Sequence, residues 1–448
     1  MRLLGMAQNF LSCDRDQAML LPPSVSEWLP EGHLARFVLD TVAQLDLESF
    51  YAVYRQDGRG RPAHDPAMMV ALLLYNYAVG VRSSRAIERR CVEDVACRVI
   101  AANETPDHVT ISRFRARFGA ALSELFFKVL ALCRQAGMVR VGTVAIDSTK
   151  LAANASPAAN RTYEGLKREA QRILDEAAQT DAREDALFGD RRGDELPEEL
   201  AVARTRAARV RQLLDEFEAR ERELKAERER ALARQAEKKA RTGKSFRGGQ
   251  VGRELRQEER KELYETKRNL TDPDSGIVRH RGQLIQGYSV QTAVAEGQVI
   301  LATAVIGVSP DHGQLEPTFE KTKDTIARLG IEDRIEAVLA DSGYWNTEQI
   351  RTIRQAGVRV LVPPIDRNAK RGVHPEVGQM RAELATEEGK QAYRRRAGIV
   401  EPVYAQIRHN RGITRILRRG KDAVQSEIDL IATTHNLLKL FRWPALTG

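Results

Sequence analysis

The 448-residue sequence predicts an α/β core, a mixed sheet flanked by helices, with an all-helical domain before it and a long helical hairpin inserted into it. Three observations support this. Helical periodicity fills the first part of the chain, a densely charged segment lies in the middle, and strand and helix patterns alternate around that segment. We expect a helical domain over 1–138, an α/β domain over 139–162 and 263–440, and a charged insertion over 163–262.

The composition limits the classes of protein that fit. Hydrophobic residues make up 42% of the chain, too many for a disordered protein. Lys and Arg number 71 against 62 Asp and Glu, and this net charge of +9 favours a polyanionic partner. The four cysteines show no CxxC spacing, so neither a zinc site nor a disulfide scaffold is expected. The longest apolar stretch, 67–81, is interrupted by Asn76 and is too short for a bilayer span of about 20 residues. We expect a cytoplasmic protein.

The helical domain contains one segment of particular interest, residues 107–118. Ile111, Phe114 and Phe118 recur at helical spacing and predict one buried face. The polar side carries three arginines, Arg113, Arg115 and Arg117. A short helix of this kind suits a helix-turn-helix element that contacts DNA. The alternative is an ordinary surface helix with solvated arginines. Further helices are expected from Pro66 onward and near 83–101 and 120–136.

The insertion has the composition of exposed helices. Between Glu218 and Arg241, 15 of 24 residues are charged. A coiled coil needs apolar residues at two positions of each seven-residue repeat. Apolar residues recur at one of these positions from Val210 to Ala231, but the residues at the other position become polar along the segment, so the coiled-coil pattern is incomplete. We expect a helical hairpin, broken near 188–194 and returning through the glycine-rich residues 242–249. A solvated spacer without a ligand is the reading we favour for this segment.

The α/β segments follow a recognisable order. A strand over 139–146 ends at Asp147, and strong turn residues occupy 271–276. The remaining elements are strands over 284–295 and 299–308, a helix over 314–329, a strand over 335–340, a helix over 346–356, a strand over 358–362 and a basic helical tail. With the insertion after the first strand, this is the order of the ribonuclease-H-like fold.

Two aspartates, Asp147 and Asp341, end apolar strands. The carboxyl ends of parallel strands face the site crevice of such sheets, so we expect the two carboxylates to lie close together. Like charges at short distance are costly unless a cation lies between them, and Mg²⁺ or Mn²⁺ prefers oxygen ligands. Glu401 is the one acid among eight arginines over 391–420, which fits a third metal ligand beside phosphate-contacting arginines. Pro402 places Glu401 at a helix kink or just before a helix start.

Other residues near these positions leave alternatives open. Asp311 is a rival ligand, although its sequence context looks like a turn. Tyr344 and Trp345 could stack on an unpaired base beside the site or pack in the core. Any single strand-terminal aspartate is more often a turn or cap residue, and the metal-site reading depends on the combination with Glu401.

The chain resembles the DDE transposases of bacterial insertion sequences, specifically the insertion-sequence 1182-like group with a long charged helical insertion after the first catalytic aspartate. The resemblance is carried by residues 60–66, 107–115, 145–150, 269–276, 287–291, 339–344 and 393–403. It implies that Asp147, Asp341 and Glu401 are catalytic and bind two Mg²⁺ (or Mn²⁺) ions. The signature of related families runs Tyr, two residues, Arg, three residues, Glu, six residues, Lys. Here four residues separate Arg396 from Glu401, and Arg408 stands at the Lys position.

The function implied by this resemblance is metal-dependent DNA cleavage at the ends of an insertion sequence, followed by strand transfer into target DNA. The expected partners are double-stranded DNA (terminal inverted repeats and target) and a second copy in a synaptic homodimer, with a nucleoid-associated location in the cytoplasm. The expected DNA-binding residues are Arg113, Arg115, Arg117, Tyr393, Arg394, Arg396, Arg408 and Trp345. The alternatives are a catalytically inactive or domesticated transposase that only binds specific DNA sequences, a nuclease that never joins strands, and a scaffold built on the hairpin.

Overall fold

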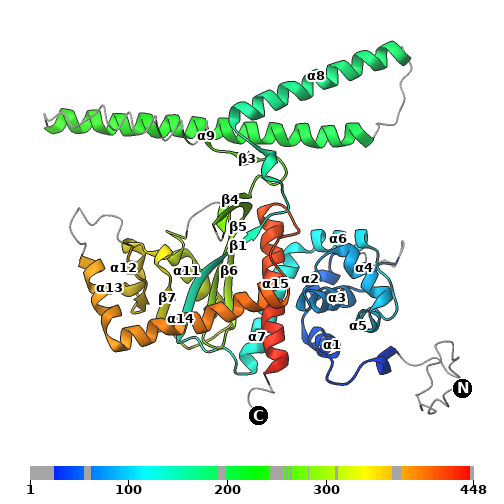
Figure 1. The fold of residues 1–448 in the computed structure, drawn as a ribbon, viewed down its shortest axis with the longest axis vertical. Helices are drawn as coiled ribbons and strands as arrows, with labels where there is room; N and C mark the ends of the chain where they lie inside the picture. Colours follow the sequence, from blue (N-terminus) through cyan, green and yellow to red (C-terminus); the bar gives the residue numbers. More distant parts are fainter. Residues whose placement is uncertain are drawn as a thin grey trace, which may run out of the picture. The chain divides into compact units, whose positions relative to one another are not determined.

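The computed structural model describes residues 25–54, 62–188, 198–242, 257, 261, 265–280, 282–307, 311–365 and 375–443 (Figure 1). The expected glycine-rich return at 243–249 and most of the expected hairpin break lie outside these residues. The chain divides into two compact units. One comprises the residues up to Tyr75 together with Ser84–Ser112, and the other comprises Asn76–Ser83 and everything from Arg113 onward.

The first unit is built from helices. They are η1 (Val25–Trp28), α1 (Leu34–Gln44), α2 (Glu48–Tyr51), most of α3 (Pro66–Ala78), α4 (Ser84–Glu93), α5 (Val95–Ile100) and the first half of α6 (His108–Arg117). The single helix expected over 83–101 is two helices in the structure. Asp94 causes the break, because it leaves helical geometry and its side chain accepts a hydrogen bond from the Cys97 amide as the N-cap of α5.

A mixed β-sheet forms the centre of the second unit, which confirms the expected α/β class. Its strands are β1 (Thr143–Ala152), β4 (Gly276–His280), β5 (Gln283–Ala295), β6 (Ile300–Ile306), β7 (Ala337–Ala340) and β8 (Arg359–Leu361). The order is β4-β5-β1-β7-β8, and β6 also pairs with β5. Strand β1 runs antiparallel to β5 and parallel to β7, and β7 is parallel to β8.

Two features of this sheet differ from the expectation. Strand β4 was not expected, and β1 continues through Asp147 to Ala152 instead of ending before it. The cause of the longer strand is its partner, because β5 pairs with every residue of β1 from Val144 to Ala152. Asp147 therefore lies inside a paired strand.

The same unit also contains helices, several of which contact the sheet. They are α7 (Gly119–Gln135), α11 (Leu315–Arg328), α12 (Thr347–Gln355), α13 (Pro375–Ala385), α14 (Glu387–Ala405), a π-helical turn (Gln406–Asn410) and α15 (Lys421–Arg442). Helix α15 contacts α7 and β6, α11 contacts β6 and β5, and α14 contacts β1, β5 and β7. No helix within the described ranges has both the length and the apolar character that a bilayer crossing requires.

The insertion contains two long helices, α8 (Tyr163–Phe188) and α9 (Glu198–Thr242), as expected for a hairpin (Figure 1). They share a small apolar cluster of Tyr163, Leu166, Leu213 and Phe217. At the base of the insertion, β2 (Asn160–Arg161) pairs with β3 (Arg268–Asn269). The buried Asn269 donates to Ser156 and Asn160 and accepts from the amides of the Thr271–Asp272 turn, so one amide side chain organises both ends of the insertion.

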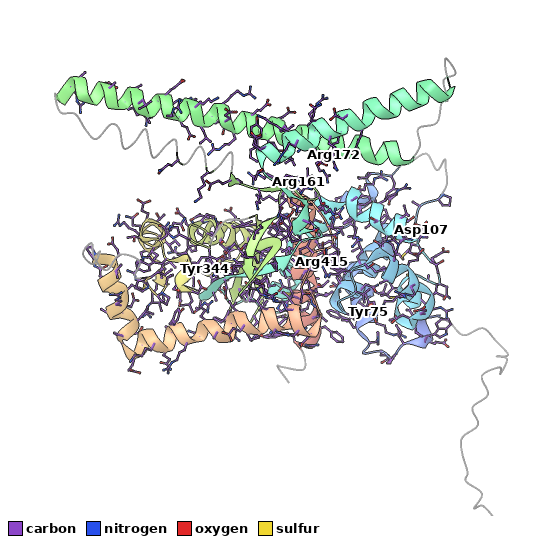
Figure 2. All side chains as sticks on the ribbon, turned by 45° about the horizontal axis from the view of Figure 1, so that its top comes forward. Tyr75, Asp107, Arg161, Arg172, Tyr344 and Arg415 are labelled. Carbon is purple, nitrogen blue, oxygen red and sulfur yellow. The ribbon has the colours of Figure 1, made fainter. Side chains whose placement is uncertain are left out.

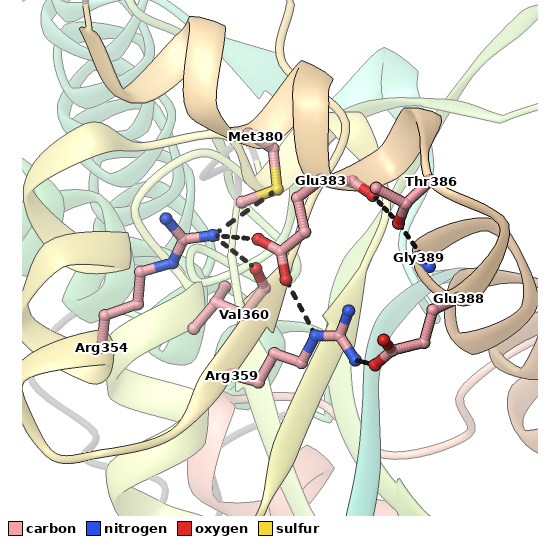
Figure 3. A network of polar contacts seen from close by, with 8 residues as sticks. All are labelled: Arg354, Arg359, Val360, Met380, Glu383, Thr386, Glu388 and Gly389. Atoms are coloured by element: carbon pink, nitrogen blue, oxygen red, sulfur yellow. Dashed lines mark hydrogen bonds and ion pairs between the residues drawn. The ribbon is translucent and has the colours of Figure 1, made fainter.

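A network of ion pairs fixes the start of α14 to the edge of the sheet (Figure 3). Glu383 of α13 accepts hydrogen bonds from Arg354 of α12 and from Arg359 of β8, each at 2.8 Å. Arg359 also pairs with Glu388 in the first turn of α14. Thr386 caps α14 by accepting from the Gly389 amide. These contacts hold the orientation of α14, the helix that carries several of the expected site residues.

Candidate active site

Asp147 and Asp341 lie at equivalent positions on neighbouring strands. The parallel register of β1 and β7 ends with the pair Ile146 and Ala340, and each aspartate is the next residue. Asp341 ends its strand and caps the short η4 helix (Ser342–Tyr344) by accepting from the Gly343 amide at 2.8 Å. Asp147 stays within its strand and accepts from the Ser148 amide at 2.7 Å. The structure thus brings these two expected residues together.

Arg396 of α14 binds the first of these aspartates directly. Its Nη2 donates to Asp147 Oδ2 at 2.6 Å, and the two side chains are only 16% and 17% exposed. Burial raises the pKa of Asp147 to about 6, with the Arg396 charge opposing the rise and the charges of Asp341 and Asp311 adding to it. A carboxylate that is short of water and close to two others is stabilised in its ionised form by a nearby cation. Arg396 supplies one such charge.

Tyrosines surround this aspartate pair. Tyr393 lies about one turn before Arg396 on α14, and its pKa is raised by burial and by the charges of Asp341 and Asp147. The pKa of Tyr404, near the end of the same helix, is raised well above its usual value by burial and then by Asp147. Tyr344 follows Asp341 in η4 (Figure 2). It is fully buried and donates its hydroxyl to Gln291 of β5. Tyr344 therefore packs in the core, the second of its two expected roles.

Glu401 is placed differently. Helix α14 runs unbroken through Pro402, and Glu401 is an exposed residue on it. Glu401 lies five positions after Arg396, a step that turns an α-helix by about 140° beyond one full turn, so the two side chains leave different faces. Among the described residues, no group of three or more His, Cys, Asp or Glu side chains is arranged to hold a metal ion. The structure brings together two of the three expected carboxylates.

The two aspartates are suitable in kind for a divalent metal. Both offer carboxylate oxygens, the hard donors that Mg²⁺ and Mn²⁺ prefer. Burial raises the pKa of Asp147, and a bound cation would oppose this rise because its charge favours the ionised carboxylate. The residues present therefore fit a divalent ion held between Asp147 and Asp341, with the third ligand unassigned by the geometry.

The arginines of α6 separate into two kinds. Arg113 and Arg117 are exposed, as expected. Arg115 is not on the outer face. It is 8% exposed and donates to the Tyr77 hydroxyl and to the Arg82 carbonyl oxygen, which corrects its expected role in DNA binding. The reason is the width of the buried stripe, because an apolar helix face spans positions i, i+3, i+4 and i+7, and Arg115 occupies i+4 from Ile111.

The arginine-rich tract near the C-terminus also divides. Arg394 is exposed, whereas Arg396 points to Asp147. Arg408 lies in the π-helical turn and donates to Thr149 at 3.3 Å, two residues from Asp147 on β1. Arg411 is buried and donates to Thr434 and to the Ile431 carbonyl oxygen of α15, so the expectation that the whole tract contacts phosphates is wrong for this residue. The half-buried Trp345 follows η4, and His312 contacts its carbonyl oxygen.

Sequence reasoning missed a polar group beside the aspartate pair. Lys150 binds Asp311 at 2.8 Å, and Gln291 donates to the same Asp311 oxygen at 2.9 Å. The sequence alone indicates Asp311 only as a rival metal ligand or a turn residue. The available signal was the alternation along the first strand, because Ser148 and Lys150 are polar residues two positions apart and must share one face of the sheet.

Comparison with known families gives two matches. Residues 23–117 match a family described as a transposase domain (DUF772), and residues 366–441 match a family described as a transposase DDE domain. No curated protein and no solved structure matches the chain. The first match includes Arg113 and Arg117, and the second includes Arg396 and Glu401. Both families are described as domains of transposases.

Proposed function

We propose that this protein is a DDE transposase of the insertion-sequence 1182-like group, which cuts DNA at the ends of an insertion sequence and joins them to target DNA. The observation that carries the proposal is the pair of aspartates at equivalent positions on parallel strands, with Arg396 bound to one of them. The two transposase-domain matches on either side of these strands support it.

The sheet is proposed to be a ribonuclease-H-like core. In support, the first strand lies at the centre between an antiparallel partner, β5, and a parallel partner, β7, and the long insertion follows that first strand. The proposed domains are a helical DNA-binding domain over 1–138, the catalytic domain over 139–162 and 263–440, and the insertion over 163–262. Two copies are proposed to act together as a homodimer in the synaptic complex.

Asp147, Asp341 and Glu401 are the proposed ligands of two Mg²⁺ or Mn²⁺ ions. Such ions, when bound, activate water or a DNA 3′-hydroxyl and stabilise the leaving oxygen during displacement at phosphorus. Phosphoryl transfer depends mainly on position and charge, so the protein's own contribution is to hold the carboxylates in place. Arg396 does this for Asp147 through its 2.6 Å contact.

DNA contacts are proposed at two places. In the helical domain, the exposed Arg113 and Arg117 are proposed to contact the terminal repeats. Near the aspartate pair, the proposed contacts are Tyr393, Arg394, Arg396, Arg408 and Trp345. Guanidinium groups bind phosphate oxygens with two parallel hydrogen bonds, which suits this role.

The test is cleavage of a DNA duplex that carries the inverted repeat bordering the coding sequence. We expect the full-length protein to cut this duplex in the presence of Mg²⁺, and Asp147→Asn to bind it equally well without cutting. Asp324→Asn, an exposed aspartate of α11, is the matched control and should cut at the wild-type rate. Cutting by Asp147→Asn at the wild-type rate would refute the site. If the wild-type protein binds the duplex without cutting it, a catalytically inactive DNA-binding protein is favoured. If it cuts the duplex but never joins the ends to target DNA, a nuclease is favoured.

A further inference from the structure

The ammonium group of Lys150 makes an unusually complete set of contacts. It donates to the Ser148 hydroxyl at 2.8 Å, to the Ser289 hydroxyl at 2.7 Å and to Asp311 Oδ1 at 2.8 Å. An ammonium has three hydrogens, so these contacts use all of them. The lysine and aspartate side chains are only 20% and 21% exposed, and such a pair is held more firmly than a surface pair.

Asp311 continues the chain of contacts toward the second aspartate. Its Oδ1 also accepts from Gln291 Nε2 at 2.9 Å, and the side-chain Oε1 of Gln291 accepts from the Tyr344 hydroxyl. Tyr344 belongs to the η4 helix that Asp341 caps. Asp311 also lies against this turn, since a Cβ placed on Gly343 would be 3.0 Å from Asp341 Oδ1 and 3.8 Å from Asp311 Oδ2. The network therefore reaches from β1 to the turn after β7.

The strand residues of this network lie on the opposite face of the sheet from Asp147. Side chains alternate along a strand, so Ser148 and Lys150 point away from the face to which Asp147 points. The register pairs Ser148 with Gln291 and Lys150 with Ser289, which puts the β5 members on that same opposite face. These strand residues thus support β1 on the face opposite Asp147, while Arg396 holds the Asp147 carboxylate.

We propose that Lys150 and Asp311 are positioning residues, whose ion pair sets the separation of Asp147 and Asp341 for a divalent metal ion. The inference rests on the proposed function. The pair fixes β1 next to Asp147, and its link through Gln291 and Tyr344 fixes the turn after Asp341. Residues that orient metal ligands in this way typically change metal affinity about 10- to 100-fold when they are removed.

Positioning and simple electrostatics predict opposite results for the lysine. Removing a positive charge near a metal site should tighten cation binding if the charge acts only through its field. If Lys150 holds β1 and Asp311 in place, its removal should weaken cation binding instead. Lys150→Met removes the charge and all three donors while keeping an unbranched chain of similar length. The direction of its effect therefore separates the two roles.

The experiment measures Mn²⁺ binding to the full-length protein without DNA, by the electron paramagnetic resonance signal of free Mn²⁺. We expect Lys150→Met and Asp311→Asn each to weaken Mn²⁺ binding about tenfold. The double variant should bind Mn²⁺ as tightly as the single variant with the lower affinity, because both residues act through one network. Tyr344→Phe removes only the last hydrogen bond and should weaken binding about threefold. This milder variant keeps the test decisive if Lys150→Met does not fold.

The controls separate this inference from the proposed function. Lys323→Met and Glu320→Gln alter a surface ion pair of α11, with side chains 47% and 49% exposed, and should leave Mn²⁺ binding unchanged. Wild-type binding that Asp147→Asn does not weaken would refute the proposed metal site itself. If Asp147→Asn loses binding but Lys150→Met binds as tightly as the wild type, or more tightly, the positioning role is wrong. Complete loss in Asp311→Asn with normal binding in Lys150→Met would make Asp311 a ligand instead.

Discussion

Replacement of Arg82 by Met should destabilise the sheet-bearing unit by several kcal/mol. Arg82 donates to Glu427 of α15 at 2.5 Å, and the two side chains are 8% and 0% exposed. Removing one partner of a buried pair leaves an uncompensated charge, which costs about 3–5 kcal/mol. Glu427 keeps hydrogen bonds from the amides of Leu417 and Arg418, so we expect the lower end of that range, about 3 kcal/mol.

The assay is urea unfolding of the full-length protein at pH 7, followed by circular dichroism. Lys390→Met is the matched control, because it breaks a surface pair with Glu387 in which the side chains are 44% and 88% exposed, and it should cost less than about 1 kcal/mol. Adding Glu427→Leu to Arg82→Met should recover much of the loss by removing the unpaired charge. A cost for Arg82→Met no larger than that of the control would refute this account of the pair.

Three further predictions concern stability and DNA binding. Burial lowers the pKa of His435 to about 3, so below the unfolded value of about 6.5 only the unfolded chain takes up its proton. The free energy of unfolding in urea should therefore fall by about 1.4 kcal/mol per pH unit below pH 6.5. His435→Gln should remove this contribution, and the same slope of unfolding free energy against pH in the variant and the wild type would contradict the explanation. Gly287→Ala should cost about 1–3 kcal/mol in urea unfolding, because its Cβ would collide with the Leu151 carbonyl oxygen, and wild-type stability would disprove the contact. Arg113→Ala with Arg117→Ala should reduce the slope of log binding constant against log salt by about 2, measured by anisotropy on terminal-repeat DNA, and an unchanged slope would exclude phosphate contacts there.

The sequence predicts well the succession of strands and helices along the chain, because that succession depends on local signals. Apolar runs such as 335–340 and turn residues such as those at 271–276 are readable without knowledge of the fold. The second half of β1 is different, since Ser148, Thr149 and Lys150 interrupt the apolar run. Its strand geometry comes from pairing with β5, a segment more than a hundred residues away in the chain. Pairing of this kind cannot be read from local pattern.

The aspartate pair could be predicted because each aspartate directly follows an apolar run of residues in the sequence. The contact between Arg396 and Asp147 could not be predicted so directly. Three consecutive arginines precede Glu401, and only the rotational phase of α14 decides which one faces the sheet. The phase was available in the apolar residues that follow, because Ile399, Val400 and Val403 are buried and lie three, four and seven positions after Arg396. The helix periodicity thus selects Arg396 over its neighbours.

The same phase has a consequence for the third expected ligand. A single unbroken α-helix cannot direct both Arg396 and Glu401 at Asp147, so Glu401 can join the aspartates only if α14 changes its winding between them. Pro402 marks a weak point for such a change, since it has no N–H to donate to the Gly398 carbonyl oxygen one turn earlier. That oxygen instead accepts from Gln298 Nε2 at 3.1 Å. The Gln298 side chain, in the turn between β5 and β6, thus replaces the hydrogen bond that Pro402 cannot make. The chain already departs from α-helical winding after α14, where the π-helical turn brings Arg408 to Thr149.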